Sequence, residues 1–346
     1  MKSDFAARLL AWHKRHGRHD LPWQGTRDAY RIWVSEIMLQ QTQVAAVIPY
    51  YQRFLERFPD IAALAAAPQD EVLRLWSGLG YYSRARNLHR AAQLVMDRHG
   101  GAFPRALEEI AALPGIGRST AAAIAAFAYG TRAAILDGNV KRVLARHFAI
   151  AGFPGEKRVE TQLWQLAEEQ LPPRAVASYT QAIMDLGATL CTRAQPACAD
   201  CPLAASCAAL ALGRVGDFPA PRPAKAQPTR ATHMLLLLRD GELLLEKRPP
   251  SGIWGGLWSL PEIDDAARVR AHCRTHYGCS IAAPQPLAPL AHGFTHFKLQ
   301  IQPLLCEVEK LAQSARAPGQ IWLSLEDAHG AAIPVPVRRL IERLLS

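Results

Sequence analysis

Apolar residues recur at helical spacing through most of the first 207 residues. In one stretch they fall at Val159, Leu163, Leu166 and Leu171, and a period near 3.6 predicts an amphipathic helix. Strand patterns are nearly absent here, so a mainly α fold is expected. Turn signals separate the helical stretches at Pro22, Pro59, Gly78–Gly80, Gly100–Gly101, Pro114–Gly117, Gly152–Gly155 and Pro172–Pro173.

The pattern changes after a stretch rich in Pro and Ala at residues 213–231, which is typical of an extended linker. Apolar strand-like runs then lie on both sides of Asp240-Gly241, a strong hairpin signal. We therefore expect a helical domain over 1–212 and a small α+β domain over 232–346. The elements expected in the second domain are strands at Thr232–Leu238, Glu242–Lys247, Phe297–Val308 and Gln320–Leu323, and helices at Asp264–Tyr277 and Val337–Leu345.

The composition is that of an ordinary globular protein, with 49% hydrophobic and 20% charged residues. No apolar run reaches the length of a membrane span, and the N-terminal residues lack the apolar core of a signal peptide. A cytoplasmic protein without a membrane partner is therefore expected.

The net charge of +10 is unevenly distributed. Residues 1–230 carry 28 Lys and Arg against 19 Asp and Glu, whereas residues 231–346 carry 12 against 11. The helical part is therefore the candidate for binding a polyanion. A basic surface that serves solubility explains the charge equally well.

Four of the seven cysteines lie within seventeen residues, at Cys191, Cys198, Cys201 and Cys207. An odd number of cysteines in a chain without a signal peptide argues against a disulfide framework. Four thiolates can hold Zn²⁺ or a 4Fe–4S cluster. Zinc sites usually contain two CxxC pairs, and this segment contains one.

A Gly-rich turn, Leu113-Pro114-Gly115-Ile116-Gly117, lies between two helical patterns and precedes a single acidic residue, Asp137. Two glycines two residues apart allow a tight turn, and the N–H groups of the turn and the following helix can bind an anion. A plain corner between helices, with Asp137 as an ordinary N-cap, explains the same residues.

A second acidic residue, Glu36, lies in the mostly apolar segment Trp33–Gln43. Partial burial raises the pKa of a carboxyl group and makes it a proton donor near neutral pH. The alternative is a solvated surface glutamate.

These segments together resemble a known family of enzymes. The turn, as a helix-hairpin-helix motif over residues 108–128, and Asp137 at its distance from the turn resemble the endonuclease III superfamily of DNA glycosylases. The cysteine spacing x6, x2, x5 resembles the iron–sulfur loop of the endonuclease III and MutY families, here at 191–207. The segment SEIMLQQTQV resembles the catalytic segment of the MutY family.

The resemblance to the MutY family implies a role for each matching residue. Glu36 is expected to protonate adenine, Asp137 to stabilise the sugar cation, and Asn139 to orient Asp137 or water. The other implied contacts are Leu21 and Trp23 in the adenine pocket; Gln40, Gln41, Thr42 and Tyr81 at the lesion pair and in the base stack; and Gly115, Gly117 and Arg118 at the DNA backbone.

Ser119 separates this chain from its bifunctional relatives, which the resemblance implies carry a nucleophilic lysine at that position. A serine cannot form an imine, so the sequence predicts a monofunctional glycosylase. Lys141 lies one turn into the next expected helix, and we do not assign it the lyase role.

The C-terminal segment Trp254–Glu262 resembles the Nudix fold. A hydrolytic Nudix enzyme needs a Glu-rich helix to hold Mg²⁺, whereas the helix expected at Asp264–Tyr277 has Arg and His in place of those carboxylates. The resemblance therefore implies a catalytically silent Nudix-like domain that recognises 8-oxoguanine. Its contacts are expected at Phe294, Thr295 and His296, where Thr295 replaces the serine of the family.

The sequence thus predicts a base-excision-repair DNA glycosylase that removes adenine mispaired with 8-oxoguanine or guanine. We expect a nucleoid-associated monomer that carries a 4Fe–4S cluster and binds double-stranded DNA; the sequence does not identify its protein partners. Two alternatives remain open, an endonuclease III-like glycosylase of pyrimidine lesions and a non-catalytic iron–sulfur protein that binds DNA.

Overall fold

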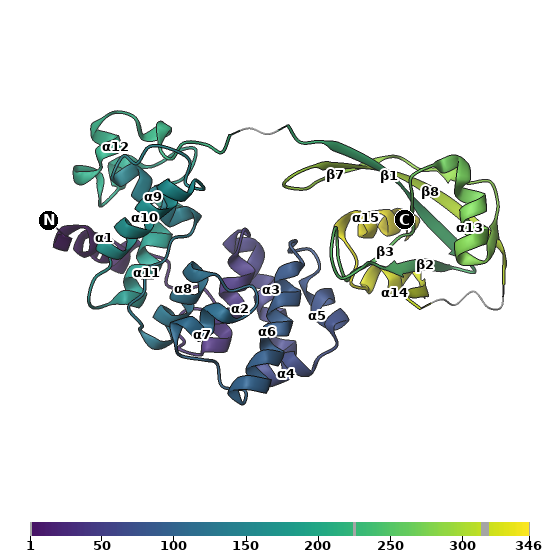
Figure 1. Ribbon diagram of the computed structural model, residues 1–346, viewed down its shortest axis with the longest axis horizontal. Coiled ribbons are helices and arrows are strands. Elements are labelled where there is room, and N and C mark those ends of the chain that lie inside the picture. The colour runs from purple at the N-terminus through teal and green to yellow at the C-terminus, as the bar shows by residue number, and fades with distance from the viewer. Residues whose placement is uncertain (1, 224–225, 313–317, 346) are drawn as a thin grey trace. The chain divides into compact units, whose positions relative to one another are not determined.

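In the computed structural model, which describes residues 2–223, 226–312 and 318–345, the chain folds into two compact units (Figure 1). The first unit comprises Met1–Ala66 and Asn87–Ala224, and the second comprises Ala67–Arg86 and Lys225–Ser346. Residues 224 and 225 of the expected linker lie outside the described residues. Among the described helices, none is both long and apolar enough to cross a membrane.

The first unit is helical, as the hydrophobic period predicts. Helix α1 packs on α11, α9 packs on α10 and α11, and α2 packs on α8. A continuous core joins α1, α9, α10 and α11 through side chains such as Leu9, Leu144, Leu163 and Ile183, all at most 1% exposed. Its helices are α1 (Lys2–His16), α2 (Ala29–Leu39), α3 (Val44–Arg57), α4 (Ile61–Ala66), α6 (Ser83–His99, whose first residues belong to the second unit), α7 (Leu107–Ala112), α8 (Arg118–Tyr129), α9 (Gly138–His147), α10 (Lys157–Glu169), α11 (Val176–Asp185) and α12 (Ala208–Ala211), with a π-helical turn η1 (Leu186–Leu190) and 3₁₀ turns η2 (Cys198–Asp200), η3 (Ala204–Ser206) and η4 (Val215–Asp217).

Helix α2 shows why the local sequence folds as it does. The Asp28 side chain caps its N-terminus by accepting hydrogen bonds from the N–H groups of Tyr30 and Arg31, which satisfies donors that the helix leaves unpaired. The helix ends before Gln40, and Gln41 has a φ of +57°. The segment that resembles the MutY catalytic segment is therefore a buried helix followed by a sharp turn.

The turn between α7 and α8 is closely packed. Gly115 has a φ of +81°, and a Cβ atom built there would lie 2.8 Å from the Cβ atom of Asn87 in α6. Any larger residue would meet both backbone strain and this contact. Gly117 is the N-cap of α8 and makes no side-chain cap, so N–H groups of the first turn of α8 are left for another acceptor.

The second unit is built on a mixed sheet with strand order β3-β2-β1-β8-β5, and β1 and β8 run parallel. The predicted hairpin is confirmed, because Leu238 pairs with Leu243 and both residues of the turn, Asp240 and Gly241, have positive φ. Strands β1 and β8 are longer than expected. The strands are β1 (Thr229–Arg239), β2 (Glu242–Lys247), β3 (Trp258–Ser259), β4 (Glu262–Ile263), β5 (Cys279–Ile281), β6 (Gln285–Pro286), β7 (Leu290–Gly293), β8 (Lys298–Leu311) and β9 (Gln320–Ser324).

Helices of the second unit complete the α+β arrangement. The helix expected from Asp264 begins later, as α13 (Val269–Tyr277), because a 3₁₀ turn, η5 (Ala266–Arg268), precedes it. Helices α14 (Leu325–Gly330) and α15 (Val335–Leu345) follow β9. The unit also contains α5 (Gln69–Trp76). The hydrophobic pattern gives no sign that α5 groups with the C-terminal residues.

Candidate active site

A cavity of about 510 Å³ opens in the first unit, within the usual range of small-molecule sites. Helices α2, α8 and α11 and the segment before α9 contribute to its wall. Most residues predicted for catalysis and for the adenine pocket line it. The lining comprises Arg18, Leu21, Trp23, Glu36, Leu39, Gln40, Thr42, Gln43, Val44, Ser119, Thr120, Ala123, Ile135, Asp137, Asn139, Gln181, Met184 and Ala188.

Glu36 reaches the cavity from the middle of α2, whose neighbouring residues Ser35 and Ile37 are buried. Burial, and after it the charge of Asp137, raise the pKa of the Glu36 carboxyl to about 8. The cause is mainly desolvation, which disfavours the charged form. Glu36 therefore holds a proton at neutral pH.

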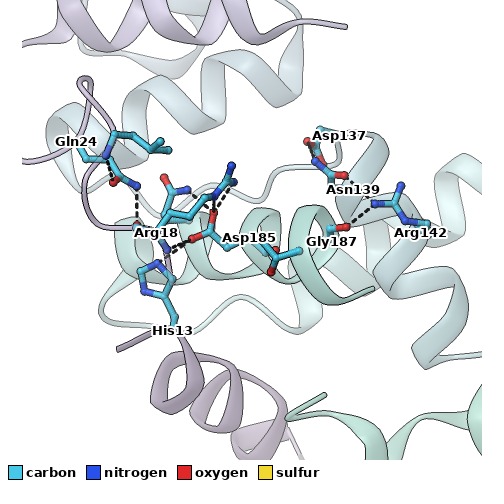
Figure 2. Close-up of polar contacts among 11 residues, drawn as sticks. His13, Arg18, Gln24, Asp137, Asn139, Arg142, Asp185 and Gly187 are labelled. Atoms are coloured by element: carbon cyan, nitrogen blue, oxygen red, sulfur yellow. Dashed lines mark hydrogen bonds and ion pairs between the residues drawn. The ribbon is translucent and has the colours of Figure 1, made fainter. Parts of the chain in front are cut away.

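Asp137 is the N-cap of α9, and its Oδ1 accepts a hydrogen bond from the Val140 N–H at 2.8 Å. The Asn139 Nδ2 atom lies 3.4 Å from its Oδ2 (Figure 2). Burial raises the pKa of Asp137, whereas the hydrogen bonds from Val140 and Asn139 and the charge of Arg142 lower it. Donors and the positive end of a helix favour the ionised carboxylate, so the environment of Asp137 differs in kind from that of Glu36.

The orientation of Asn139 is itself fixed (Figure 2). The Arg142 guanidinium donates to the Asn139 side-chain oxygen at 2.8 Å and to the Gly187 carbonyl at 2.7 Å. It also donates to the Cys191 carbonyl at 2.7 Å. Asp137 and the first cysteine of the cluster segment are thus connected through one arginine of α9.

The hairpin lies against the same cavity. Gln40 donates to the Gly115 carbonyl at 3.4 Å and to the Thr120 hydroxyl at 3.3 Å. The Ser119 hydroxyl accepts a hydrogen bond from the Leu136 N–H at 2.9 Å, which fixes the segment leading to Asp137. Arg118 is exposed and lies 3.9 Å from the ring centroid of Trp164, with Glu168 as an ion-pair partner.

Sequence reasoning missed one wall of the cavity, which Arg18, Gln181, Met184 and Ala188 form. Asp185 organises the first two of these residues, because its fully buried carboxylate accepts hydrogen bonds from the Arg18 backbone N–H at 2.9 Å and the Gln181 amide at 2.8 Å (Figure 2). The available signal was a lone carboxylate in an otherwise uncharged helix, because a buried charge requires partners.

The four clustered cysteines are half-buried and unpaired. Burial, and then the neighbouring thiols, raise the pKa of Cys201 to about 11, so the thiol groups lie near one another. Within the described chain, no three His, Cys, Asp or Glu side chains are close enough to hold a single metal ion. Buried Arg146 donates to the Cys191 sulfur at 3.4 Å, and its carbonyl accepts from the Cys207 sulfur at 3.6 Å.

The remaining predicted contacts lie outside the cavity wall. Gln41 is exposed at the end of α2 in the first unit. In the second unit Tyr81 is 44% exposed whereas Tyr82 is 8% exposed, so the first is available to a ligand and the second belongs to the core. Thr295 and His296 are exposed as well, beside a half-buried Phe294.

Comparisons with known proteins agree with this division. Residues 34–169 match the HhH-GPD superfamily of base excision DNA repair proteins, and residues 233–343 match the NUDIX domain. The chain is 34% identical to the adenine DNA glycosylase of Buchnera aphidicola over 339 residues, 98% of this chain and 97% of that protein. The chain belongs to the adenine DNA glycosylase family. The human adenine DNA glycosylase is likewise 34% identical, over 97% of this chain and 73% of that protein.

The fold of the helical part is shared with solved glycosylases. A structure described as a thermostable thymine-DNA glycosylase superposes with a TM-score of 0.55 at 29% identity, over 61% of this chain and 97% of that one. The resemblance seen in the sequence is thus confirmed at the level of family and fold. Adenine DNA glycosylases are hydrolases of N-glycosyl bonds.

Proposed function

We propose that this member of the adenine DNA glycosylase family removes adenine mispaired with 8-oxoguanine or guanine in double-stranded DNA, by hydrolysis of the N-glycosidic bond. The observation that supports this most is the pair of carboxyl groups at one cavity. Glu36 holds a proton and Asp137 is surrounded by donors. Two carboxyl groups whose environments differ in this way can divide the roles of acid and anion.

The first chemical requirement is access. Adenine in a duplex is stacked and paired, so it must leave the helix before an enzyme can reach the sugar–base bond. The cavity accepts the extruded base between Leu21, Trp23 and Gln181. Glu36 then donates its proton to a ring nitrogen of adenine, which leaves as a neutral base. Such proton donation accelerates a reaction roughly 10²–10⁴-fold.

Departure of the base leaves an oxocarbenium-like sugar, which needs a negative charge near it. Asp137 provides that charge, and the hydrogen bonds from Val140 and Asn139 hold the carboxylate in place. An anion fixed in advance stabilises a developing cation without reorganisation at the moment of reaction. Water then completes the hydrolysis, and Asn139 orients Asp137 or that water.

Ser119 restricts the reaction to removal of the base, without cleavage of the DNA strand. Its hydroxyl is bound to the Leu136 N–H and cannot form the imine on which strand cleavage by lyase chemistry depends. Lys141, at the start of α9, is paired with Glu160 at 2.6 Å. We therefore propose a monofunctional glycosylase.

Recognition of DNA involves residues of both units. Gly115, Gly117 and Arg118 bind backbone phosphate at the N-terminus of α8, where N–H groups remain available. The ion pair of Arg118 with Glu168 is exposed, and such pairs are weak, so a phosphate can replace it. We further assign these contacts by family resemblance: Gln40, Gln41, Thr42 and Tyr81 to the mispair and the base stack, and Phe294, Thr295 and His296 to 8-oxoguanine.

We also propose that Cys191, Cys198, Cys201 and Cys207 hold a 4Fe–4S cluster. When bound, such a cluster folds and stiffens the segment that carries its ligands and takes no part in hydrolysis. Broad visible absorption of the purified protein, together with bound iron, is the expected result, since Zn²⁺ is a d¹⁰ ion without redox chemistry or colour. A colourless protein that contains zinc would contradict it.

Excision assays on three duplexes test the function. The first holds adenine opposite 8-oxoguanine, the second adenine opposite guanine, and the third thymine glycol; each product is analysed with and without alkali. Adenine release from the first two, with strand breaks only after alkali, is expected. Cleavage of thymine glycol would favour an endonuclease III-like enzyme, and binding of all duplexes without excision would favour a non-catalytic DNA-binding protein. Strand breaks without alkali would contradict the role given to Ser119.

A further inference from the structure

The segment that carries Tyr81 has a fixed conformation within the second unit. Gly80 and Tyr81 both have positive φ, +73° and +49°. The Gly80 carbonyl accepts hydrogen bonds from the Trp76 indole at 3.2 Å and from the Arg84 guanidinium at 3.1 Å. Arg84 is buried and lies 5.6 Å from the Tyr81 ring centroid. Hydrogen bonds to the Gly80 carbonyl therefore fix the turn, while the Tyr81 ring remains exposed to solvent.

Side chains near both ends of this segment are bound by the C-terminal residues of the same unit. On the side of α5, the Ser77 hydroxyl donates to the Ile333 carbonyl at 2.9 Å and accepts from Arg338 at 3.1 Å. On the side of α6, the Arg86 guanidinium donates to the Gly255 carbonyl. Both sides of the Tyr81 segment are therefore attached to C-terminal groups of the same unit.

The loop that receives Arg86 has little freedom. Gly256 donates to the Pro249 carbonyl at 2.9 Å, and a Cβ atom on Gly255 would lie 2.7 Å from the Pro250 carbonyl oxygen. Trp254, which precedes these glycines, has a φ of +54° although it is not glycine. Non-glycine residues seldom adopt this conformation and keep it only where their surroundings enforce it.

The surroundings of Trp254 are the aromatic residues beside the loop 294–296. Its ring centroid lies 5.6 Å from that of Phe294 and 5.8 Å from that of His292, and its side chain is 7% exposed. Phe294 in turn stacks on Phe297 at 4.4 Å. Thr295 follows directly, so the residue proposed to meet 8-oxoguanine is one position from a ring that touches Trp254.

We propose that Trp254 is a positioning residue that couples the 294–296 loop to the Tyr81 segment, through Gly255 and Arg86. Contact of Thr295 with the base opposite adenine and insertion of Tyr81 into the duplex then favour each other, because closely packed groups transmit displacement rather than absorb it. The enzyme would thereby extrude adenine faster when the opposite base is 8-oxoguanine than when it is guanine. This inference rests on the function proposed above.

The test compares Trp254→Ala with Trp322→Ala under single-turnover conditions. Trp322 is a half-buried indole of the same domain, on β9, and packs against a core cluster that does not include Trp254. The measured quantity is the ratio of excision rates opposite 8-oxoguanine and opposite guanine. We expect Trp254→Ala to lower this ratio about tenfold, chiefly through the 8-oxoguanine duplex, and Trp322→Ala to change it less than about twofold, a coupling of roughly 1.4 kcal/mol for the tenfold effect.

A second readout follows Tyr81 directly. A 2-aminopurine base next to the mispair gains fluorescence when an inserted side chain unstacks it, and Trp254→Ala should slow that signal on the 8-oxoguanine duplex. Arg86→Met, which removes the bond to Gly255 and leaves the aromatic contacts in place, should act in the same direction. Trp254→Phe should restore most of the ratio. If Trp254→Ala is too unstable to assay, Arg86→Met alone decides the matter.

A double-mutant cycle separates coupling from a general loss of structure. In a Tyr81→Ala background, Trp254→Ala should change the ratio less than about twofold, because the coupled partner is gone. Equal effects of Trp254→Ala with and without Tyr81 would overturn the inference, as would an unchanged ratio in both Trp254→Ala and Arg86→Met. A wild-type protein that does not excise adenine would instead overturn the proposed function.

Discussion

The middle of α2 and the N-terminus of α9 each bring one carboxyl group to the same cavity, and burial raises the pKa of both, but only the carboxyl group at α9 has donors that oppose this effect. Around Glu36 the helix is apolar, and burial and the charge of Asp137 both favour its neutral form. Around Asp137 burial also raises the pKa, but a helix begins there, and the N–H of Val140, the amide of Asn139 and the charge of Arg142 oppose this effect by favouring the ionised form. The two residues are chemically almost identical, so the fold creates the difference between them.

This contrast explains how one site can supply both an acid and an anion at neutral pH. Each charge also disfavours ionisation of the other, so the proton resides mainly on the group with fewer donors. A substitution that removes the proton of Glu36 and one that removes the charge of Asp137 should therefore change the rate of excision and its pH dependence differently.

Glu36→Gln keeps the size of the side chain but removes the proton donor. We expect single-turnover excision of adenine to fall roughly 10²–10⁴-fold, the usual contribution of a positioned general acid. Binding of a duplex that holds a non-cleavable adenine analogue should change little. A variant that is fully active with only a shifted pH optimum would reduce Glu36 to an auxiliary role.

Asp137→Asn keeps the cap of α9, since asparagine is also a good N-cap, but removes the negative charge. We expect excision to fall roughly 10²–10³-fold, the scale of one lost electrostatic stabiliser, while affinity for the mispaired duplex is retained. Circular dichroism should show unchanged helix content. Normal turnover by Asp137→Asn would remove this residue from the mechanism.

The pH dependence of excision should report the proton on Glu36. Because the pKa of Glu36 is about 8 in the folded protein, the rate should fall about tenfold per pH unit above that pH. The rate should also fall at acidic pH, because Asp137 must be ionised and burial raises its pKa. The alkaline limb should disappear in Glu36→Gln. An alkaline limb that persists in Glu36→Gln would assign the titration to another group.

Stability should respond with opposite signs at the two positions. The folded-state pKa of Glu36 is raised from 4.5 to about 8, so its ionisation costs stability progressively between these pH values and fully above them. Glu36→Gln should therefore stabilise the protein at pH 9, on the order of 2–4 kcal/mol after allowance for partial exposure, and have little effect at pH 4.

Asp137→Ala should instead destabilise the protein by about 0.5–2 kcal/mol through loss of the cap of α9. Thermal unfolding at both pH values measures this, and stabilisation of equal size at pH 4 would point to packing.

Much of the architecture was available from local sequence. The 3.6-residue period predicted the helices of the first unit, and Asp240-Gly241 predicted the hairpin, because such signals depend on neighbours close in the chain. The helix expected from Asp264 begins later, because the Asp265 carboxylate accepts a hydrogen bond from the Ala267 N–H and caps a 3₁₀ turn at that point. The short strands β3–β7 were not predicted, because two to four residues carry too little periodicity.

Some residues of the candidate site could be predicted from the sequence and others could not. Glu36, Asp137, Ser119 and the four cysteines stand in segments with distinctive spacing, so the sequence was enough to single them out. Arg18 and Gln181 could not be found, because they reach the cavity only through the buried carboxylate of Asp185, 167 residues from Arg18 in the chain. Nothing in residues 67–86 indicated that Ser77 and Arg86 are bound by C-terminal groups.

The sequence by itself therefore determined the family, the helical and α+β parts, and the residue types that the chemistry uses. Only the tertiary structure decided which of two similar carboxyl groups keeps its proton. It also decided which arginine lines the cavity and which tryptophan packs against Phe294. The reason is physical: pattern and spacing are local properties of the chain, whereas desolvation, charge and ring contacts depend on groups that folding brings together from distant positions.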